Sequence, residues 1–239
     1  DLHLSIRRQR QMCIRDSNST IYGKQKNIVN HRFVVEPIRL GCVLIDRTKG
    51  KGETMRFGFW PNPRSDYEDT KQLANHAEQI GYDGIWLADH FLPEETELIP
   101  VHESWITMAA LSRDVPRLRI GTMVSGNTYR HPAVLANMVA TLDNLNNGRS
   151  VLGIGSGWQQ NEHEAYGIAY DTIGIRLRKL DEACQIFKGL FNNDYFDFDG
   201  EFYTLKHAPL EPKPKQVKLP LMIGGGGEKV TLRIAAKYA

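Results

Sequence analysis

Along residues 55–239, short apolar segments alternate with longer amphipathic ones. The apolar segments have the length of single β-strands, and they lie at 55–60, 84–88, 117–124, 151–154 and 219–223. The segments between them place apolar residues three or four positions apart, as in helices that bury one side, and they lie at 65–80, 103–114, 132–148 and 176–191. Short buried strands that alternate with such helices predict a parallel sheet covered by helices.

Local signals mark where some of these elements begin and end. Ser65, with Glu68 three residues later, predicts a capping box at the start of the first helix. Residues 159–218 are too long for a minimal connection and are interpreted as an insertion, with a small hairpin at 197–205 and a proline-rich connector after it. The last helix is predicted to open at Glu228.

Every predicted strand ends in polar residues or glycines. In parallel α/β folds the carboxyl ends of the strands meet at one edge, where ligands bind. The clearest case is the strand at 151–154, which stops at Gly155-Ser156-Gly157-Trp158. Glycines there permit unusual φ and ψ angles and let a ligand approach the backbone. A tight strand-to-helix turn without a ligand would have the same pattern.

A barrel accounts for this repeat better than a doubly wound open sheet does. The open sheet would be expected to carry G-x-G-x-x-G directly after its first strand, and residues 55–66 lack that motif. The predicted fold class is therefore α/β, a TIM (β/α)8-type barrel. Such a barrel typically takes about 250 residues, and this chain has room for about five of the eight βα units. We expect an incomplete barrel that lacks its C-terminal units.

Residues 1–54 differ from the rest in composition. They are rich in Arg, Gln, Asn and Ser without sustained periodicity, and they carry the excess of basic residues in a chain whose formal net charge is +2. We expect this leader to be non-native or disordered, with the natural protein beginning at Met55. A transit-like extension, or a basic tail that binds an acidic surface, are the alternatives.

The composition of the remaining chain argues against several classes of partner. Residues 55–239 are mildly acidic, which gives no reason to expect a nucleic-acid partner. No apolar run approaches the length of a membrane span, so a membrane partner is not expected. Two of the three cysteines, Cys13 and Cys42, lie in the leader. A disulfide framework is therefore not expected, and a cytoplasmic location fits.

Four motifs in the body of the chain occur together and in a characteristic order. They are GYDGIWLADHF at 81–91, RLRIGTMVSGNTYRHPAVLANMVATLD at 117–143, RSVLGIGSGWQQNEHEAYGI at 149–168 and PLMIGGGGEKVTLRIAAKYA at 220–239. On these residues the chain resembles the luciferase-like monooxygenase superfamily, and most of all its coenzyme F420-dependent oxidoreductase branch. The resemblance implies a TIM-type barrel that holds an isoalloxazine or deazaflavin ring at the carboxyl ends of its strands.

The resemblance also implies roles for the residues at the strand ends. His90 is the expected catalytic residue, as a proton donor or a hydrogen-bond partner of ring or substrate. Many members have a non-prolyl cis peptide bond at the position of Met123 and Val124. The expected cofactor-binding residues are Asp89, Met123, Val124, Ser125, Asn127, Ser156, Gly157, Trp158, Gly225, Gly226 and Gly227. The last three precede a helix, whose N–H groups and positive dipole end suit the cofactor's phosphate.

Several of these residues have plainer alternatives. His90 could be structural, Asp89 could orient His90 or cap its loop, and the glycine run could be a flexible turn. His131 is expected to be structural, whereas Arg130 could meet a cofactor carboxylate or phosphate. Residues 161–164 match no zinc motif such as H-E-x-x-H, so we expect no metal.

Trp158 distinguishes this chain from the sugar-phosphate dehydrogenases of the superfamily. Sugar-phosphate dehydrogenases of the superfamily carry a catalytic Glu at that position, so glucose-6-phosphate-type chemistry is not expected. The resemblance favours hydride transfer between coenzyme F420 and a small organic substrate. The alternatives are a reduced-FMN-dependent monooxygenase of the alkanal or alkanesulfonate type, and a non-catalytic flavin-binding barrel. We expect a homodimer when full length, with a small-molecule substrate as its partner.

Overall fold

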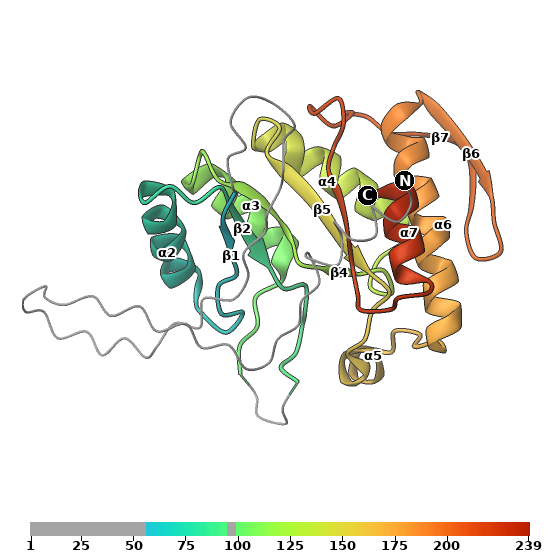
Figure 1. Cartoon of the computed structure of the whole chain (residues 1–239), viewed down its shortest axis with the longest axis horizontal. Coiled ribbons are helices and arrows are strands. Elements are labelled where there is room, and N and C mark those ends of the chain that lie inside the picture. Colours follow the sequence, from blue (N-terminus) through green and yellow to red (C-terminus); the bar gives the residue numbers. More distant parts are fainter. Residues whose placement is uncertain (1–55, 95–98) are drawn as a thin grey trace, which may run out of the picture.

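The computed structural model of the chain describes residues 56–94 and 99–239 (Figure 1). Its main sheet contains six strands, which are β1 (Gly58–Phe59), β2 (Gly84–Leu87), β3 (Arg119–Thr122), β4 (Ser125–Gly126), β5 (Ser150–Gly155) and β8 (Leu221–Gly224). The predicted strand at 117–124 corresponds to β3, and the two-residue strand β4 follows it after the cis peptide bond that joins Met123 to Val124. The leader, 1–54, lies outside the described residues.

The order of the strands follows the order of the chain. β1 pairs with β2, β2 with β3, β3 with β5, and β5 with both β4 and β8, and all of these pairs are parallel. A doubly wound sheet would reverse direction at a switch point. Among the described strands no reversal occurs, and each βα unit pairs with the next one. This is the order of strands around a barrel, and it argues against the open-sheet alternative.

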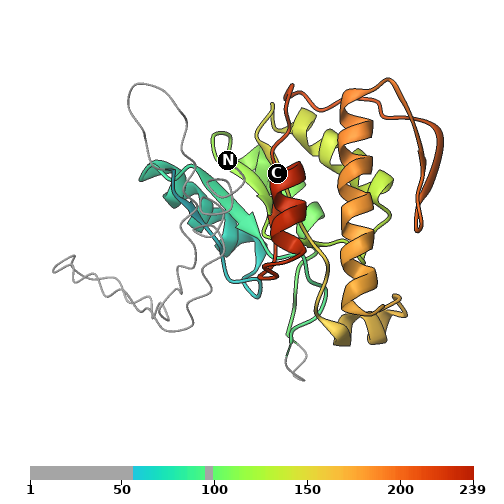
Figure 2. The same cartoon turned by 45° about the vertical axis from the view of Figure 1, so that its right-hand side comes forward.

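Helices cover the outer face of this sheet (Figures 1 and 2). They are α2 (Tyr67–Gln79), α3 (Ser104–Asp114), α4 (Pro132–Leu145), α6 (Ile173–Asn192) and α7 (Thr231–Tyr238). Side chains from alternate positions of β2, Ile85 and Leu87, join the apolar core formed with these helices. The predicted parallel sheet covered by helices is therefore confirmed. None of the described helices is long and apolar enough to cross a membrane.

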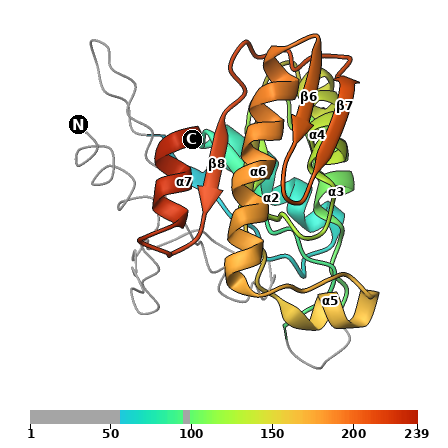
Figure 3. The same ribbon diagram turned by 90° about the vertical axis from the view of Figure 1, so that its right-hand side faces the viewer.

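The predicted insertion contributes a short helix and a hairpin. Helix α5 (Gln160–Tyr166) lies at the carboxyl end of the sheet, and the antiparallel strands β6 (Tyr195–Asp199) and β7 (Thr204–Pro209) lie beside α6 (Figure 3). Glu182 on α6 accepts hydrogen bonds from three backbone N–H groups of the hairpin turn, at 201–203. These bonds fix the turn to the helix. The predicted hairpin is confirmed, with strands that extend further than 197–205.

Two predicted helix starts are wrong by a few residues. The N-cap of α2 is Asp66 and not Ser65, because the N–H of Asp69 donates to Asp66 Oδ1 at 2.8 Å. Adjacent Ser and Asp residues are both good N-caps, so the sequence could not decide between them. The last helix begins at Thr231 and not at Glu228, since a turn follows the glycine run.

Arg149 joins two helix ends to the sheet immediately before β5. Its guanidinium donates to the carbonyl oxygens of Ser112 at 2.8 Å and Val115 at 3.2 Å, and also to that of Leu118. Its Nε donates to the carbonyl oxygen of Asn146 at 2.7 Å. These are the C-terminal ends of α3 and α4 and the residue before β3, where carbonyl groups lack partners within the helices. One side chain thus stabilises three connections.

Replacing Arg149 with Met is expected to lower the free energy of unfolding by about 2–4 kcal/mol, because it removes several charge-assisted hydrogen bonds to carbonyl groups. Urea unfolding followed by tryptophan fluorescence measures the change. Arg178→Met is the matched control, since the Arg178–Glu201 pair is more than half exposed on both sides. The control should stay within about 0.5 kcal/mol of the wild type. An equal loss in both variants would contradict this role of Arg149.

Candidate functional site

The loops that follow the strands adjoin at one edge of the sheet, as predicted. The N–H of Asn127, after β4, donates to the carbonyl oxygen of Gly155 at 2.9 Å. The rings of His90, after β2, and Trp158, after β5, meet edge to face with centroids 5.5 Å apart. Val124 lies over β5, where a Cβ added to Gly155 would be 3.0 Å from its Cγ2. Close packing of the strand ends therefore brings these residues together.

Asp89 is held inside the protein by an ion pair. Its side chain is fully buried, Arg130 donates to its two oxygens at 2.6 and 3.0 Å, and Ser104 Oγ donates at 2.8 Å. Arg130 also donates to Glu103 at 2.6 Å. Burial alone would lower the pKa of Arg130, but the two carboxylates outweigh it and raise the pKa. Both side chains are therefore engaged with protein groups, Asp89 with Arg130 and Ser104, and Arg130 with Asp89 and Glu103.

His90 contacts a residue that the sequence did not identify. Its Nδ1 lies 3.0 Å from Oε2 of Glu162, which belongs to α5. The His90 side chain is 20 % exposed, whereas that of Glu162 is fully buried. The other ring nitrogen, Nε2, has no partner among the described residues. A histidine held in this way can present Nε2 to a ligand at the mouth of the site.

Glu162 is the centre of a dense group of hydrogen bonds. Its Oε1 accepts from the N–H groups of Phe91 at 2.5 Å and Leu92 at 2.9 Å, and its Oε2 accepts from the hydroxyl of Tyr129 as well as from His90. Burial acts to raise the pKa of Glu162, but these four bonds outweigh it and hold the pKa below its ordinary value. Burial and the neighbouring carboxylate raise the pKa of Tyr129. Glu162 is therefore ionised, and Tyr129 is a hydrogen-bond donor.

Ser125 lies in β4 and Asn127 follows that strand directly, and both residues are buried. Ser125 Oγ accepts from the indole N–H of Trp105 at 3.1 Å. The carboxamide of Asn127 contacts the Tyr203 hydroxyl at 3.3 Å, while its other polar atom, Oδ1, has no partner within the described ranges. Orphaned buried polar atoms are rare in folded proteins, and one at a strand mouth indicates a hydrogen bond to a ligand.

Gly157 and Trp158 shape the loop after β5. Gly157 has φ +81°, and a Cβ there would lie 2.6 Å from Thr128 Oγ1, so both its backbone and its neighbour require glycine. Thr128 Oγ1 is also bonded to Nε2 of the buried His163, at 2.7 Å. Ser156 is half-buried, and Trp158 is 55 % exposed. The loop therefore places an open indole face beside His90.

The glycine run, 225–227, lies at the other end of the same row of loops. β3 and β5 separate β8 from β2 in the sheet, so two strands lie between the strand before the run and the strand before His90. Gly225, Gly226 and Gly227 are exposed, and the N–H groups of Gly226 and Gly227 have no partner among the residues that the structure describes. Free N–H groups just ahead of α7 suit an anion. A ligand that spans the row would be long, with a planar end near His90 and an anionic end here.

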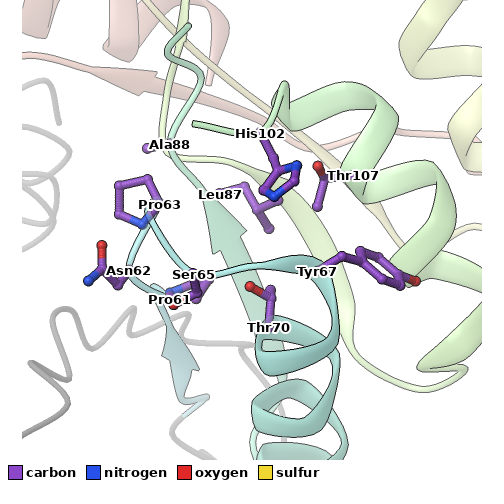
Figure 4. A pocket seen from close by; sticks show the side chains of 10 residues that line it. All are labelled: Pro61, Asn62, Pro63, Ser65, Tyr67, Thr70, Leu87, Ala88, His102 and Thr107. Atoms are coloured by element: carbon purple, nitrogen blue, oxygen red, sulfur yellow. The ribbon is translucent and has the colours of Figure 1, made fainter. Parts of the chain in front are cut away.

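A pocket opens at the same edge but on the helix side of the sheet (Figure 4). It is lined by Pro61, Asn62, Pro63, Ser65, Tyr67, Thr70, Leu87, Ala88, His102 and Thr107. These residues belong to the loop between β1 and α2, the start of α2, the end of β2, and α3 with the segment before it. None of the predicted site residues lines it, although Ala88 directly precedes Asp89 in the chain.

Three residues near the site were not among the predicted site residues. Glu162 contacts the predicted residue His90, Tyr203 contacts the predicted residue Asn127, and the Tyr129 hydroxyl donates to Glu162. Glu162 and Tyr203 come from the insertion, whose path over the sheet no local pattern predicts. His131, expected to be structural, is indeed the N-cap of α4, as its Nδ1 accepts from the N–H of Ala133 at 3.2 Å.

Comparisons with known proteins place the chain in a family. The sequence model of the luciferase-like monooxygenases matches residues 39–239. An F420-dependent glucose-6-phosphate dehydrogenase from Amycolatopsis mediterranei (strain U-32) is 36 % identical over 174 residues, which are 72 % of this chain and 50 % of the relative. The chain thus spans about half the length of the curated relatives it matches.

Solved structures show the same fold. An F420-dependent secondary alcohol dehydrogenase, in complex with an F420-acetone adduct, matches with a TM-score of 0.64 and 26 % identity over 70 % of this chain and 51 % of its own. A coenzyme F420-dependent tetrahydromethanopterin reductase from Methanopyrus kandleri matches with a TM-score of 0.63 and 18 % identity over 72 % and 50 %. The predicted TIM-type barrel is confirmed, in partial form. The chain belongs to the luciferase-like monooxygenase family.

Proposed function

We propose that the protein is an oxidoreductase that transfers a hydride between coenzyme F420 and a small organic substrate. Relatives that match the chain are named for F420-dependent dehydrogenation, and one similar structure holds an F420-acetone adduct. The single observation of this structure that carries the proposal is the orphaned Oδ1 of Asn127, a buried residue that follows the cis peptide bond in the chain. A buried acceptor without a protein partner can accept a hydrogen bond from a bound molecule.

The residues along the carboxyl edge fit such a cofactor. Asn127 and the Met123–Val124 peptide would contact its ring, Trp158 would form a wall, and the N–H groups of Gly226 and Gly227 would hold its phosphate. When bound, the deazaflavin supplies the carbon that accepts or gives up the hydride. The protein binds and orients both partners, and Nε2 of His90 exchanges the proton with the substrate.

The substrate we propose has an apolar surface. The exposed indole of Trp158 lies next to His90, so a substrate that reaches Nε2 contacts an aromatic face. Curated relatives are named for glucose-6-phosphate, but Trp158 stands where the family resemblance implies a catalytic Glu in sugar-phosphate dehydrogenases. Trp158 therefore favours a small alcohol or carbonyl compound over a sugar phosphate. Turnover of secondary alcohols above turnover of glucose-6-phosphate is the expected result.

Fluorescence titration of the purified protein with F420 and with FMN tests the choice of cofactor. We expect F420 to bind more tightly, and Asn127→Ala to weaken F420 binding about 10-fold, for the loss of roughly 1.4 kcal/mol of hydrogen bonding. Asn192→Ala is the control, because the Asn192 side chain is exposed and bonds only to the carbonyl oxygen of Lys188. Tight FMN binding without F420 binding would favour the reduced-FMN monooxygenase instead.

Replacement of His90 tests the catalytic proposal. His90→Ala is expected to lower kcat about 100- to 10,000-fold, the range for a positioned acid or base, while F420 still binds. His76→Ala, at an exposed position of α2, should leave kcat unchanged. If the wild-type protein binds the cofactor but shows no turnover with any alcohol or carbonyl compound, that result would favour the alternative of a non-catalytic flavin-binding barrel.

We further propose a cytoplasmic homodimer. The one cysteine among the described residues, Cys184, is a buried free thiol, which is compatible with a reducing compartment. Ile106 on α3 and Val134 on the neighbouring α4 are 73 % and 55 % exposed, which supports an apolar contact there. Sedimentation equilibrium should show a dimer that Ile106→Glu with Val134→Glu converts to a monomer. A wild-type monomer at all concentrations would exclude the dimer.

A further inference from the structure

We propose that Glu162 is a positioning residue that fixes the tautomer of His90, with the proton on Nδ1 and the acceptor lone pair on Nε2 at the mouth of the site. The role of Nε2 toward a substrate rests on the proposed function. The tautomer itself is a property of the protein alone and can be measured without cofactor or substrate.

The first support is the number of donors around the carboxylate. Oε1 receives the N–H groups of Phe91 and Leu92, and Oε2 receives the Tyr129 hydroxyl and Nδ1 of His90. An ionised carboxylate can only accept hydrogen bonds. The neutral imidazole must therefore carry its proton on Nδ1 to make this contact, and Nε2 is left without a proton.

The second support is the rigidity of the helix that carries Glu162. Gln159 Nε2 donates to the carbonyl oxygen of Leu92 at 2.9 Å, and Asn161 Nδ2 donates to that of Pro93, also at 2.9 Å. His163 bonds through Nδ1 to the carbonyl oxygen of Gln159 at 2.7 Å. The start of α5 is thus tied to the same loop that carries His90, and the Glu162 carboxylate cannot turn away.

The third support is the way the ring is enclosed. Trp158 meets His90 edge to face, and Glu162 holds the opposite nitrogen, so the ring has one orientation in which both contacts exist. Asp89 precedes His90 in the chain but is fully engaged by Arg130 and Ser104. Among the described carboxylates, Glu162 is therefore the one that orients His90, rather than Asp89.

The substitution Glu162→Gln should change the tautomer of His90. The amide oxygen must still face the N–H groups of Phe91 and Leu92, so the amide nitrogen faces His90 and Tyr129. An amide nitrogen only donates. Nδ1 of His90 must then accept, and the proton moves to Nε2. The substitution is expected to invert the tautomer, whereas a carboxylate that only caps the loop would leave it unchanged.

The experiment is two-bond ¹H–¹⁵N correlation NMR of histidine-labelled protein without cofactor. It is run at alkaline pH, and His90→Asn identifies the signal among the eight histidines of the chain. We expect a protonated Nδ1 in the wild type and a protonated Nε2 in Glu162→Gln. Glu164→Gln is the matched control, because Glu164 is exposed on the same helix and bonds to Gln160. It should resemble the wild type.

The wild-type spectrum alone can overturn the proposal, by showing the proton on Nε2. A folded Glu162→Gln protein that keeps the proton on Nδ1 would also overturn it. If Glu162→Gln does not fold, Tyr129→Phe is the second variant: it removes one donor but keeps the carboxylate, so Nδ1 should stay protonated, and a proton on Nε2 would count against Glu162.

Turnover then separates this inference from the proposed function. With F420 and an alcohol, an inverted tautomer should lower kcat by at least about 100-fold, since Nε2 no longer accepts a proton. An inverted tautomer with unchanged kcat would support the role of Glu162 in setting the tautomer, and it would contradict the catalytic role of His90. Absence of turnover in the wild type, with the expected tautomer, would count against the F420 reaction only.

Discussion

Two carboxylates buried at the carboxyl edge of the sheet determine how the surrounding segments are arranged. Asp89 and Glu162 have fully buried side chains, and removing the partners of a buried charge costs several kcal/mol. Arg130 and Ser104 satisfy the first, while the loop after β2 and Tyr129 satisfy the second. The donors come from α3, from the segment between β4 and α4, and from the loop beside α5. These segments cannot separate without leaving a charge unpaired.

This frame leaves a small set of groups open to a ligand. Nε2 of His90, the indole face of Trp158, Oδ1 of Asn127 and the N–H groups of Gly226 and Gly227 lie along one row of loops. They match a long molecule with a planar ring and an anionic group, as the proposed deazaflavin cofactor has. Rigid support behind the open groups matters for catalysis, because a reacting group must be held within a fraction of an ångström of its productive position.

The hydrophobic pattern predicted the strands, the helices and their order because each element buries one face or stripe, and burial leaves a period in the sequence. It also placed the polar strand ends at one edge. Helix starts were less certain, since Ser65 and Asp66 are equally good caps and only the folded backbone selects Asp66. Glu162 was beyond prediction from spacing, because the contact with His90 spans 72 residues and depends on where the insertion folds back.

The sequence by itself determined the parallel βα architecture, the edge of the sheet at which the polar strand ends gather, and the identity of the residues at those strand ends. Those follow from local periodicity and from the geometry of parallel strands, which are properties of short segments. Only the tertiary structure decided that Asp89 forms an ion pair with Arg130, that Asn127 Oδ1 has no partner among the described residues, and that Glu162 is hydrogen-bonded to His90. The physical reason is that hydrogen-bond partners of buried groups are chosen by distance in space, which the sequence spacing does not record.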